Sequence, residues 1–387
     1  MEPKQHNQFS LLAEKRFAPF FWTQFAGAFN DNIYKNVLML IIAFQSTGSV
    51  VDSDVLINLA AGLFILPFFL FSALAGQIAD KYEKSGLIRM VKLAEIAIMI
   101  LAAGALLFDA RMTLLFLLFL MGAQSTFFGP VKYSIIPQHL DEKEIIGGNA
   151  LVEMGTFVSI LLGTMAGGFL AQQGRVWPAA AVIVTAVVGW LVCRKIPAAS
   201  PSAPTLKINW NLVSETYRTL AYATRERTVF LSILGISWFW FLGASYLTQI
   251  PNYTKDALHG AESVATALLT MFSIGIGCGS LLCEWLSGKK VEYGLVPIGS
   301  AGLCIFGLDL AFAYSSPDPG VLLNLGAFLK TPGSIRVLAD LVLLGIFGGL
   351  YIVPLFALVQ LRSEASHRSR VIAANNILNA LFMVAAA

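Results

Sequence analysis

Long apolar segments recur along the chain, and their length constrains the fold more than any other feature of the sequence. Most of them exceed the ~18 residues that distinguish a membrane span from a buried helix of a soluble protein. Charged residues make up only 13% of the chain, about half of what soluble domains carry. The sequence therefore predicts an all-α polytopic membrane protein. The expected spans are residues 18–44, 55–79, 87–108, 112–136, 145–171, 177–192, 229–250, 264–286, 295–314 and 337–361, with an eleventh that begins at 371.

Basic residues are distributed unevenly between the two ends of these spans. If the N-terminus is cytoplasmic, 18 of the 26 Lys and Arg residues lie in cytoplasmic segments and five lie on the far side. Cytoplasmic loops of membrane proteins carry this excess of positive charge. The sequence thus predicts a multi-pass protein with a cytoplasmic N-terminus.

A polar linker divides the spans into two groups. Residues 197–228 begin with a Pro/Ser-rich stretch that is typical of a flexible connection. From Trp210 to Arg227 the pattern fits either an amphipathic helix on the cytoplasmic leaflet or a solvated connector. We therefore expect an N-terminal six-helix bundle over 1–196 and a C-terminal bundle over 229–387.

The two groups of spans resemble each other, as the internal repeats of secondary transporters do. Two sets of six spans joined by a cytoplasmic linker form the plan of the major facilitator fold. On that plan the chain is expected to stop within helix 11 and to lack helix 12. Pro130 corresponds to Pro354, Asn149 to Asn375, and Glu153 to Asn379. We expect Asn149, Asn375, Glu153 and Asn379 to act in gating.

The first span carries a polar cluster near its centre, formed by Asn30, Asp31, Asn32 and Lys35. A charged side chain at the centre of a span costs ~2.5–3.5 kcal/mol on insertion scales and usually faces a cavity or a partner. Lys35 follows Asp31 by four residues, so both lie on one face of a helix. They can form a self-neutralising structural pair, or the cluster can line a cavity that binds a polar substrate. The flanking amides favour the cavity.

Spans four and five add two further charged residues, Lys132 and Glu153. Lys132 can act as a partner of Asp31 or of an anionic substrate. Because it lies near the predicted end of its span, it can also extend to the membrane interface. Glu153 is one turn past Asn149 on the same face, and we expect it to pair with Lys132 or a cytoplasmic arginine as a gate.

The segment GQIADKYEKSGLIR, residues 76–89, fits the loop pattern that follows span two in the major facilitator fold. Gly76 permits close helix approach, and Asp80 can cap a helix or pair across the loop. With Lys81 and Lys84, these residues are predicted to form a latch that stabilises one access state. In span three, Lys92 and Glu95 (92–95) are expected to form an interface ion pair.

Buried charge is scarcer in the second group of spans. Span seven offers Trp238 and Trp240 as an apolar wall and Gln249 as a polar contact, although aromatic residues at helical spacing also pack or face lipid. One charged half-cavity and one apolar half suit a substrate with a charged head and a hydrocarbon tail. Asp340 is expected to pair with Arg336, one turn before it.

No pattern in the sequence indicates a cofactor, a metal ion or a nucleic-acid partner. The four cysteines lie in or beside apolar runs and lack the CxxC spacing of a zinc or redox site. We interpret them as packing residues. The basic residues form no continuous tract of the kind that binds nucleic acid. A transporter is therefore expected, and not an enzyme.

Three segments of the first half, GAFNDNIYKNVLML (27–40), FFGPVKYSIIP (127–137) and NALVEMGTFVSILLGTMAGG (149–168), resemble the lysophospholipid transporter family of the major facilitator superfamily. The resemblance covers about residues 17–170. It implies the transfer of lysophospholipids, such as lysophosphatidylethanolamine, across the bacterial inner membrane by alternating access, followed by reacylation. It also implies a polar network of Asp31, Lys132 and Glu153, and a fused or associated acyltransferase as a partner, since some relatives carry one.

On this interpretation Lys132, together with Lys35, attracts the phosphate, while Asn30, Asp31 and Asn32 bind the rest of the headgroup. The acyl chain stays against apolar side chains and membrane lipid. Two alternatives remain open at this point. One is a proton-coupled exporter of small amphipathic compounds in which Asp31 is titrated. The other is a membrane domain that tethers a fused acyltransferase.

Overall fold

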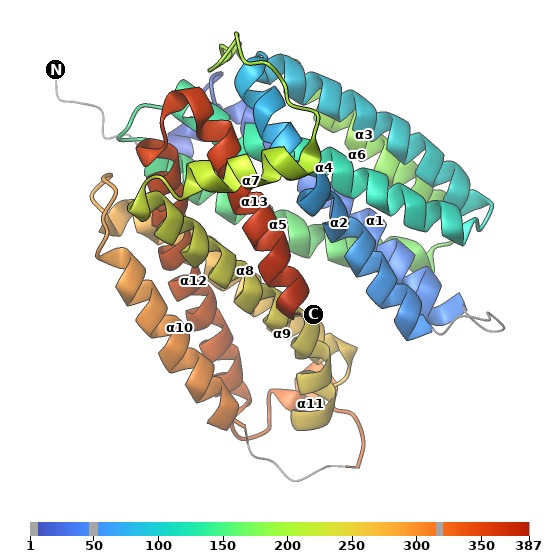
Figure 1. Ribbon diagram of the computed structural model, residues 1–387. Helices are drawn as coiled ribbons and strands as arrows, with labels where there is room; N and C mark the ends of the chain where they lie inside the picture. Colours follow the sequence, from blue (N-terminus) through green and yellow to red (C-terminus); the bar gives the residue numbers. More distant parts are fainter. Residues whose placement is uncertain (1–6, 46–52, 315–319, 387) are drawn as a thin grey trace.

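The computed structural model describes residues 7–45, 53–314 and 320–386, and Figure 1 shows that helices account for nearly all of it. Each expected span is a helix whose ends lie within three residues of the prediction. The long helices are α1 (Ala18–Gln45), α2 (Ser53–Lys81), α3 (Lys84–Leu107), α4 (Arg111–His139), α5 (Ile145–Gln172), α6 (Val176–Cys193), α8 (Arg227–Asn252), α9 (Glu262–Leu286), α10 (Leu295–Phe312), α12 (Ser334–Arg362) and α13 (Arg368–Ala386).

The all-α membrane class predicted from the sequence is confirmed. Ten helices in the described part of the chain are long and apolar enough to cross a bilayer. Helix α1 has 28 residues and packs among them, but its polar residues lower its mean hydropathy. Within the described ranges, β-structure is limited to an isolated bridge between Gly260 and Leu323.

Several short elements join or flank the long helices. A 3₁₀-helix, Gln8–Ala13, precedes α1, and α7 (Leu212–Ala223) forms the second half of the linker. A π-helical turn, Tyr253–Ala257, extends α8. The remaining two are α11 (Leu325–Phe328) and a 3₁₀ turn, Ala365–His367.

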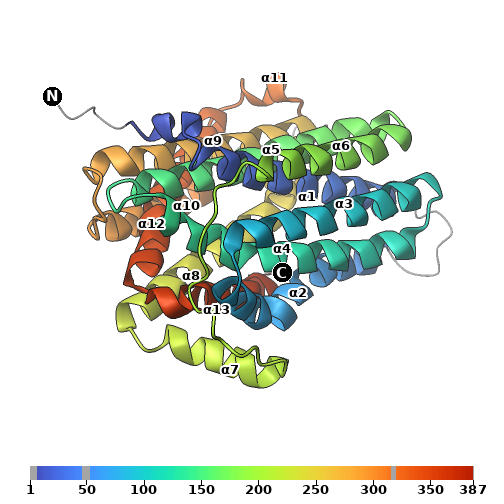
Figure 2. The same ribbon diagram turned by 90° about the horizontal axis from the view of Figure 1, so that it is seen from above.

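The long helices pack as two groups, and α2, α4 and α5 of the first meet α9, α12 and α13 of the second. In the first group α1 lies along α5 and α6, and α2 lies along α4; in the second, α12 lies along α9 and α10, and α13 along α8. The groups meet where α5 packs against α9 and where α13 packs against α2, as the two views together show (Figures 1 and 2). We call the end of the bundle that carries the linker, residues 197–228, the linker face. It also holds the C-terminal ends of α2 and α12 and the first turn of α13.

Glycines let α1 and α5 approach so closely that α1 is held in register against α5. A Cβ atom at Gly163 would lie 2.9 Å from the Cβ of Asn32, and one at Gly167 would lie 2.9 Å from the carbonyl oxygen of Ile33. The small residues of the segment at 163–168 therefore allow tight helix packing. This contact fixes the rotation of the polar cluster of α1.

Candidate functional site

A cavity of about 290 Å³ lies between the two groups of helices. The first group supplies most of its polar lining, from α1, α3, α4 and α5, whereas the second contributes aromatic residues and asparagines. The charged residues that line the cavity are Asp31, Lys35, Lys92 and Lys132.

Asp31 and Lys35 share one wall of this cavity, but they do not form an ion pair among the described residues. One oxygen of Asp31, Oδ2, accepts a hydrogen bond of 3.0 Å from the hydroxyl of Ser125. The other, Oδ1, is buried and has no hydrogen-bond partner within the described chain. The ammonium of Lys35 lies over the ring of Phe64, 4.5 Å from its centroid. The expected shared face is therefore present, and both charges face the cavity.

Lys132 lies in the cavity wall and not only at the membrane interface. Its ammonium donates a hydrogen bond of 3.0 Å to the hydroxyl of Thr156, and it lies 5.0 Å from the ring centroid of Tyr133. Glu153 is fully buried behind the wall and accepts a hydrogen bond of 2.8 Å from the hydroxyl of Tyr133. The expected pairing of Glu153 with Lys132 is therefore indirect, since Tyr133 lies between the two charges.

Lys92 and Glu95 form the predicted ion pair, at 2.6 Å, with side chains only 1% and 2% exposed. The pair is not at the membrane interface, because Lys92 also lines the cavity. Space for it is made by Gly27 of α1, where any side chain would collide with the Lys92 ammonium. The i, i+3 spacing of Lys92 and Glu95 predicted the ion pair. The sequence did not predict that Lys92 of α3 reaches α1 at Gly27.

Asn30 and Asn32, which the sequence grouped together, play different parts. The side chain of Asn30 is buried and donates a hydrogen bond of 3.0 Å to Glu95, so it does not line the cavity. The expected contact between Asn30 and a ligand is thus replaced by a contact that holds Glu95. Asn32 does line the cavity, while its amide also bonds to the carbonyl oxygen of Ala28 at 2.7 Å.

The second group of helices gives the cavity an uncharged wall among the described residues. Trp240 lines it and stacks on Phe157 at 6.0 Å. Asn375 and Asn379 of α13 also line it, and Asn379 accepts a hydrogen bond of 2.8 Å from Ser237. With Asn376 this wall is more polar than the sequence predicted.

Two residues expected in the site lie elsewhere. Trp238 is half exposed, stacks on Phe241 at 5.1 Å and is absent from the cavity lining. Gln249 is exposed and also lies outside that lining. Helical spacing alone could not separate them from Trp240, because neighbouring helices decide which face of α8 meets the cavity. Likewise, Arg336 pairs with Asp309 of α10 and not with Asp340, which is on its own helix.

Contacts between the two groups close the cavity towards the linker face. Asp80 of α2 accepts hydrogen bonds of 3.0 Å from the backbone N–H of Ser369 and from Nε of Arg370, both in α13. Gly76 permits this contact, since a Cβ there would lie 2.9 Å from the Cα of Arg370. Lys84, next in the predicted latch, instead donates to the hydroxyl of Ser202 in the linker at 2.9 Å.

Lys81, the remaining predicted latch residue, is partly exposed, with its ammonium 5.6 Å from the ring centroid of Tyr82. It does not reach α13 through any contact of the described residues.

A second closing contact joins α5 to α12. The amides of Asn149 and Gln360 exchange two hydrogen bonds, of 2.7 and 2.9 Å, and both side chains are buried. Nearby, the rings of Tyr133 and Phe356 stack at 4.2 Å. Gln360 was missed from the sequence; an amide in the otherwise apolar end of span ten was the available signal.

A larger cavity, of about 1070 Å³, lies next to the first, towards the end of the bundle opposite the linker face. It lies between α1 and α5 on one side and α8 and α9 on the other, and Asn32 and Ile160 line both cavities. Its lining is mainly apolar, with Arg175 and Glu262 near its outer end. A polar chamber that is closed towards the linker face thus lies beside a larger and mainly apolar space.

Outside the membrane-spanning helices, one carboxylate holds the linker to α3. Glu83 accepts hydrogen bonds from the backbone N–H groups of Ala199, Ser85 and Gly86, at 2.6 to 2.8 Å. Burial alone would raise the pKa of Glu83, but these hydrogen bonds outweigh it and lower the pKa.

Comparison with known proteins agrees with this architecture. Residues 20–387 match the Major Facilitator Superfamily. The chain is 28% identical over 317 residues to the lysophospholipid transporter LplT of Klebsiella pneumoniae, covering 79% of this chain and 71% of the relative. It is also 28% identical over 352 residues to LplT of Escherichia coli O157:H7, covering 89% and 79%. A crystal structure of the human organic anion transporter MFSD10 superposes with a TM-score of 0.69 at 13% identity, covering 95% of this chain and 92% of that one.

Proposed function

The chain belongs to the major facilitator superfamily, and we propose that this transporter moves lysophospholipids, such as lysophosphatidylethanolamine, across the bacterial inner membrane by alternating access. In this proposal the linker face is cytoplasmic, which places most Lys and Arg residues and the N-terminus inside. Transport runs from the outer to the inner leaflet, where an acyltransferase, fused or separate, restores the second acyl chain. The LplT relatives named above support the substrate class.

The observation that carries the proposal is the difference in polarity between the two adjacent cavities. The smaller one is lined by Asp31, Lys35 and Lys132, and one oxygen of Asp31 is buried without a hydrogen-bond partner among the described residues. A buried phosphate needs opposite charge and hydrogen-bond donors, and a buried ammonium needs acceptors. We assign the phosphate to Lys35 and Lys132 and the headgroup amine to Asp31. The acyl chain fits the apolar lining of the larger cavity.

The same assignment gives the transport step a structural basis. The closed linker face depends on Asp80 with Arg370 and on Asn149 with Gln360, all buried between the two groups of helices. Opening towards the cytoplasm requires these contacts to separate while contacts at the opposite end form. Rocking of the two groups around a fixed site near the bilayer midplane is how such repeats alternate access.

The test is uptake of labelled lysophosphatidylethanolamine by proteoliposomes that contain the full chain. Asp31→Asn and Lys132→Gln should each lower uptake at least tenfold. Lys143→Gln, at an exposed position on the linker face, should leave uptake unchanged. A proton uncoupler should have no effect, because a lipid gradient maintained by reacylation can drive transport. Uncoupler-sensitive movement of amphipathic cations with no movement of lysolipid would refute the proposal and favour proton-coupled export.

A further inference from the structure

The linker helix α7 lies across the linker-face ends of α2 and α13 and does not run alongside them (Figures 1 and 2). It begins at Asn211, whose side chain caps it by accepting a hydrogen bond of 3.0 Å from the N–H of Ser214. Its last turn leads within a few residues into α8. Thus α7 sits at the level where the spanning helices leave the membrane.

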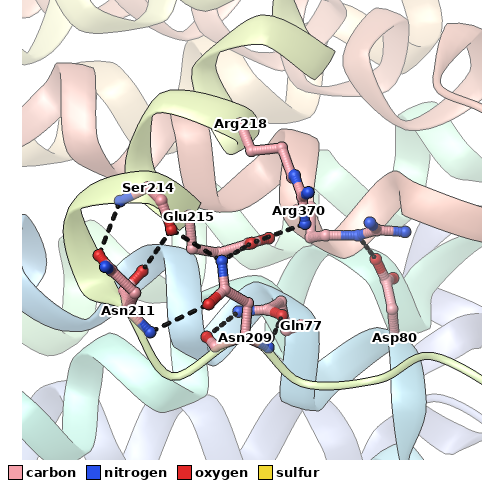
Figure 3. A network of polar contacts seen from close by, with 8 residues as sticks. All are labelled: Gln77, Asp80, Asn209, Asn211, Ser214, Glu215, Arg218 and Arg370. Atoms are coloured by element: carbon pink, nitrogen blue, oxygen red, sulfur yellow. Dashed lines mark hydrogen bonds and ion pairs between the residues drawn. The ribbon is translucent and has the colours of Figure 1, made fainter.

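Polar contacts hold α7 and the residues that lead into it to the rest of the protein (Figure 3). The side chain of Gln77 in α2 exchanges two hydrogen bonds, of 3.1 and 2.8 Å, with the backbone of Asn209. Glu215 is buried and accepts a hydrogen bond of 3.3 Å from the side chain of Asn209. The guanidinium of Arg370, which pairs with Asp80, lies 4.7 Å from the ring centroid of Tyr222.

The outer face of α7 is apolar and exposed. Trp210, Val213 and Tyr217 are 71%, 82% and 79% exposed. Val213 and Tyr217 are four residues apart and share one stripe of α7, and Trp210 lies two residues before the helix begins. Because the described part of the chain leaves most of the surface of these side chains exposed, burying them against another apolar phase is favourable. Tryptophan and tyrosine are the residues enriched at the boundary between lipid headgroups and acyl chains.

Basic residues border this stripe. Lys207, Arg218 and Arg225 are exposed. Arg218 also lies 3.7 Å from the carboxylate of Glu215, with 63% of its side chain exposed, and the guanidinium of Arg225 lies 4.4 Å from the ring centroid of Tyr222. The single acidic residue of α7, Glu215, points inward. The outer face therefore combines an apolar stripe with positive charge and no exposed carboxylate of α7, the combination that binds a helix to an anionic membrane surface.

We propose that this outer face of α7, formed by Trp210, Val213 and Tyr217 with Lys207, Arg218 and Arg225, is a binding surface for anionic phospholipid at the linker face. The surface is continuous with the lipid-facing belt of the spanning helices, because α7 packs directly on α2, α8 and α13. Aromatic rings would lie at the acyl boundary while the basic groups contact headgroup phosphates. The inference does not depend on which substrate the cavity carries.

The test measures lipid contact directly, in vesicles that contain the full chain. A fluorescent bimane is attached at Val213→Cys after the exposed Cys278 and Cys304 are changed to Ala, while the buried Cys193 and Cys283 are kept. A trace of lipid carries a nitroxide quencher near the headgroup end of its acyl chain. We expect at least twofold stronger quenching in vesicles with 30% phosphatidylglycerol than in pure phosphatidylcholine, and loss of the difference at high salt.

Charge-matched variants make the result specific. The triple variant K207Q/R218Q/R225Q should lose the dependence on phosphatidylglycerol. The control K143Q/K195Q/K290Q removes three exposed basic residues between other helices on the same face and should keep it. Equal quenching in the two kinds of vesicle, or an unquenched label in both, would overturn the proposal. Protection of the label only when a membrane protein extract is added would overturn it in favour of a protein partner. Because transport is not the readout, these outcomes are independent of the proposed substrate.

Discussion

Replacing Asp80 by Asn should open the linker face. The carboxylate is fully buried and pairs with Arg370, whose side chain is only 8% exposed. Asn keeps an oxygen that can accept from the N–H of Ser369, but it removes the charge opposite the guanidinium. Removing one partner of a buried ion pair costs ~3–5 kcal/mol, and we take the lower end because Arg370 also bonds to the carbonyl oxygen of Ser366 at 2.9 Å.

The contacts of Asp80 with Ser369 and Arg370 join α2 to α13 and therefore exist only while the linker face is closed. A cost of about 3 kcal/mol, at 1.36 kcal/mol per factor of ten, shifts the balance between closed and open states about 150-fold towards the open one. Spin labels at Lys143→Cys and Lys290→Cys, exposed positions in the first and second groups, report the separation of the two groups at this face. The long-distance population should rise in Asp80→Asn.

The control is Glu83→Gln, three residues away. Its hydrogen bonds hold α3 and the linker residue Ala199 and do not reach the second group of helices. Adding Arg370→Gln to Asp80→Asn removes the uncompensated charge. The double variant should therefore shift the balance towards the open state by less than the sum of the shifts caused by the two single variants. An unchanged distance distribution in a folded Asp80→Asn protein would refute the argument that this pair stabilises the closed state.

Three further predictions follow from the geometry. Because the folded-state pKa of Glu83 is lowered, its contribution to stability is present above its unfolded pKa of about 4.3 and is lost as the pH falls through the folded value. The unfolding temperature of the intact protein should therefore fall more steeply below pH 5 than that of Glu83→Gln; parallel curves would contradict this. Gly163→Ala should destabilise the protein by ~1–3 kcal/mol through overpacking against α1, whereas Gly62→Ala, whose Cβ would meet nothing within 4 Å, should not, as thermal unfolding in detergent can show. Lys92→Gln should lower the free energy of unfolding by ~3–5 kcal/mol, because it leaves Glu95 buried without an opposite charge. The double variant K92Q/E95Q should recover most of that loss in the same measurement. Equal stability of the single and double variants would rule out the pair as a structural element.

The helices were predictable from the sequence, but the direction of individual side chains was not. Apolar length alone located every span, because a bilayer demands ~20 apolar residues and full backbone hydrogen bonding. The neighbouring Asn30 and Asn32 could not be separated in this way. Their difference arises because α3 supplies Glu95 behind Asn30, while Asn32 faces the space between the two groups. Such facts depend on how distant helices pack.

Glycine positions would have narrowed the prediction further. Gly27 lies opposite the Lys92 ammonium, Gly76 opposite Arg370 and Gly163 opposite Asn32. At Gly76 and Gly163 another helix approaches through its backbone, whereas at Gly27 the ammonium of a lysine side chain enters. Gly27 and Gly76 each lie four residues before an aspartate, Asp31 and Asp80. A glycine one turn from an ionisable residue therefore indicates, at these two positions, a partner on another helix, although the sequence does not reveal which helix that is.

The charges of the first group are arranged in two layers, and this arrangement decides which of them can serve a ligand. Glu95 and Glu153 are buried behind the cavity wall, where they hold Lys92 and Tyr133. Lys35 and Lys132 line the cavity. Among the described residues, Lys35 contacts the ring of Phe64, and Lys132 contacts the ring of Tyr133 and the hydroxyl of Thr156.

A headgroup phosphate would therefore displace only weak partners from Lys35 and Lys132, whereas at Lys92 it would compete with a buried carboxylate. The two classes of lysine should behave differently in one experiment. The double variant K35Q/K132Q should lose most lysolipid uptake in the proteoliposome assay while its unfolding temperature stays within a few degrees of the intact protein. Loss of stability as large as that of Lys92→Gln would mean that Lys35 and Lys132 are structural, and the assignment of the phosphate to them would be wrong.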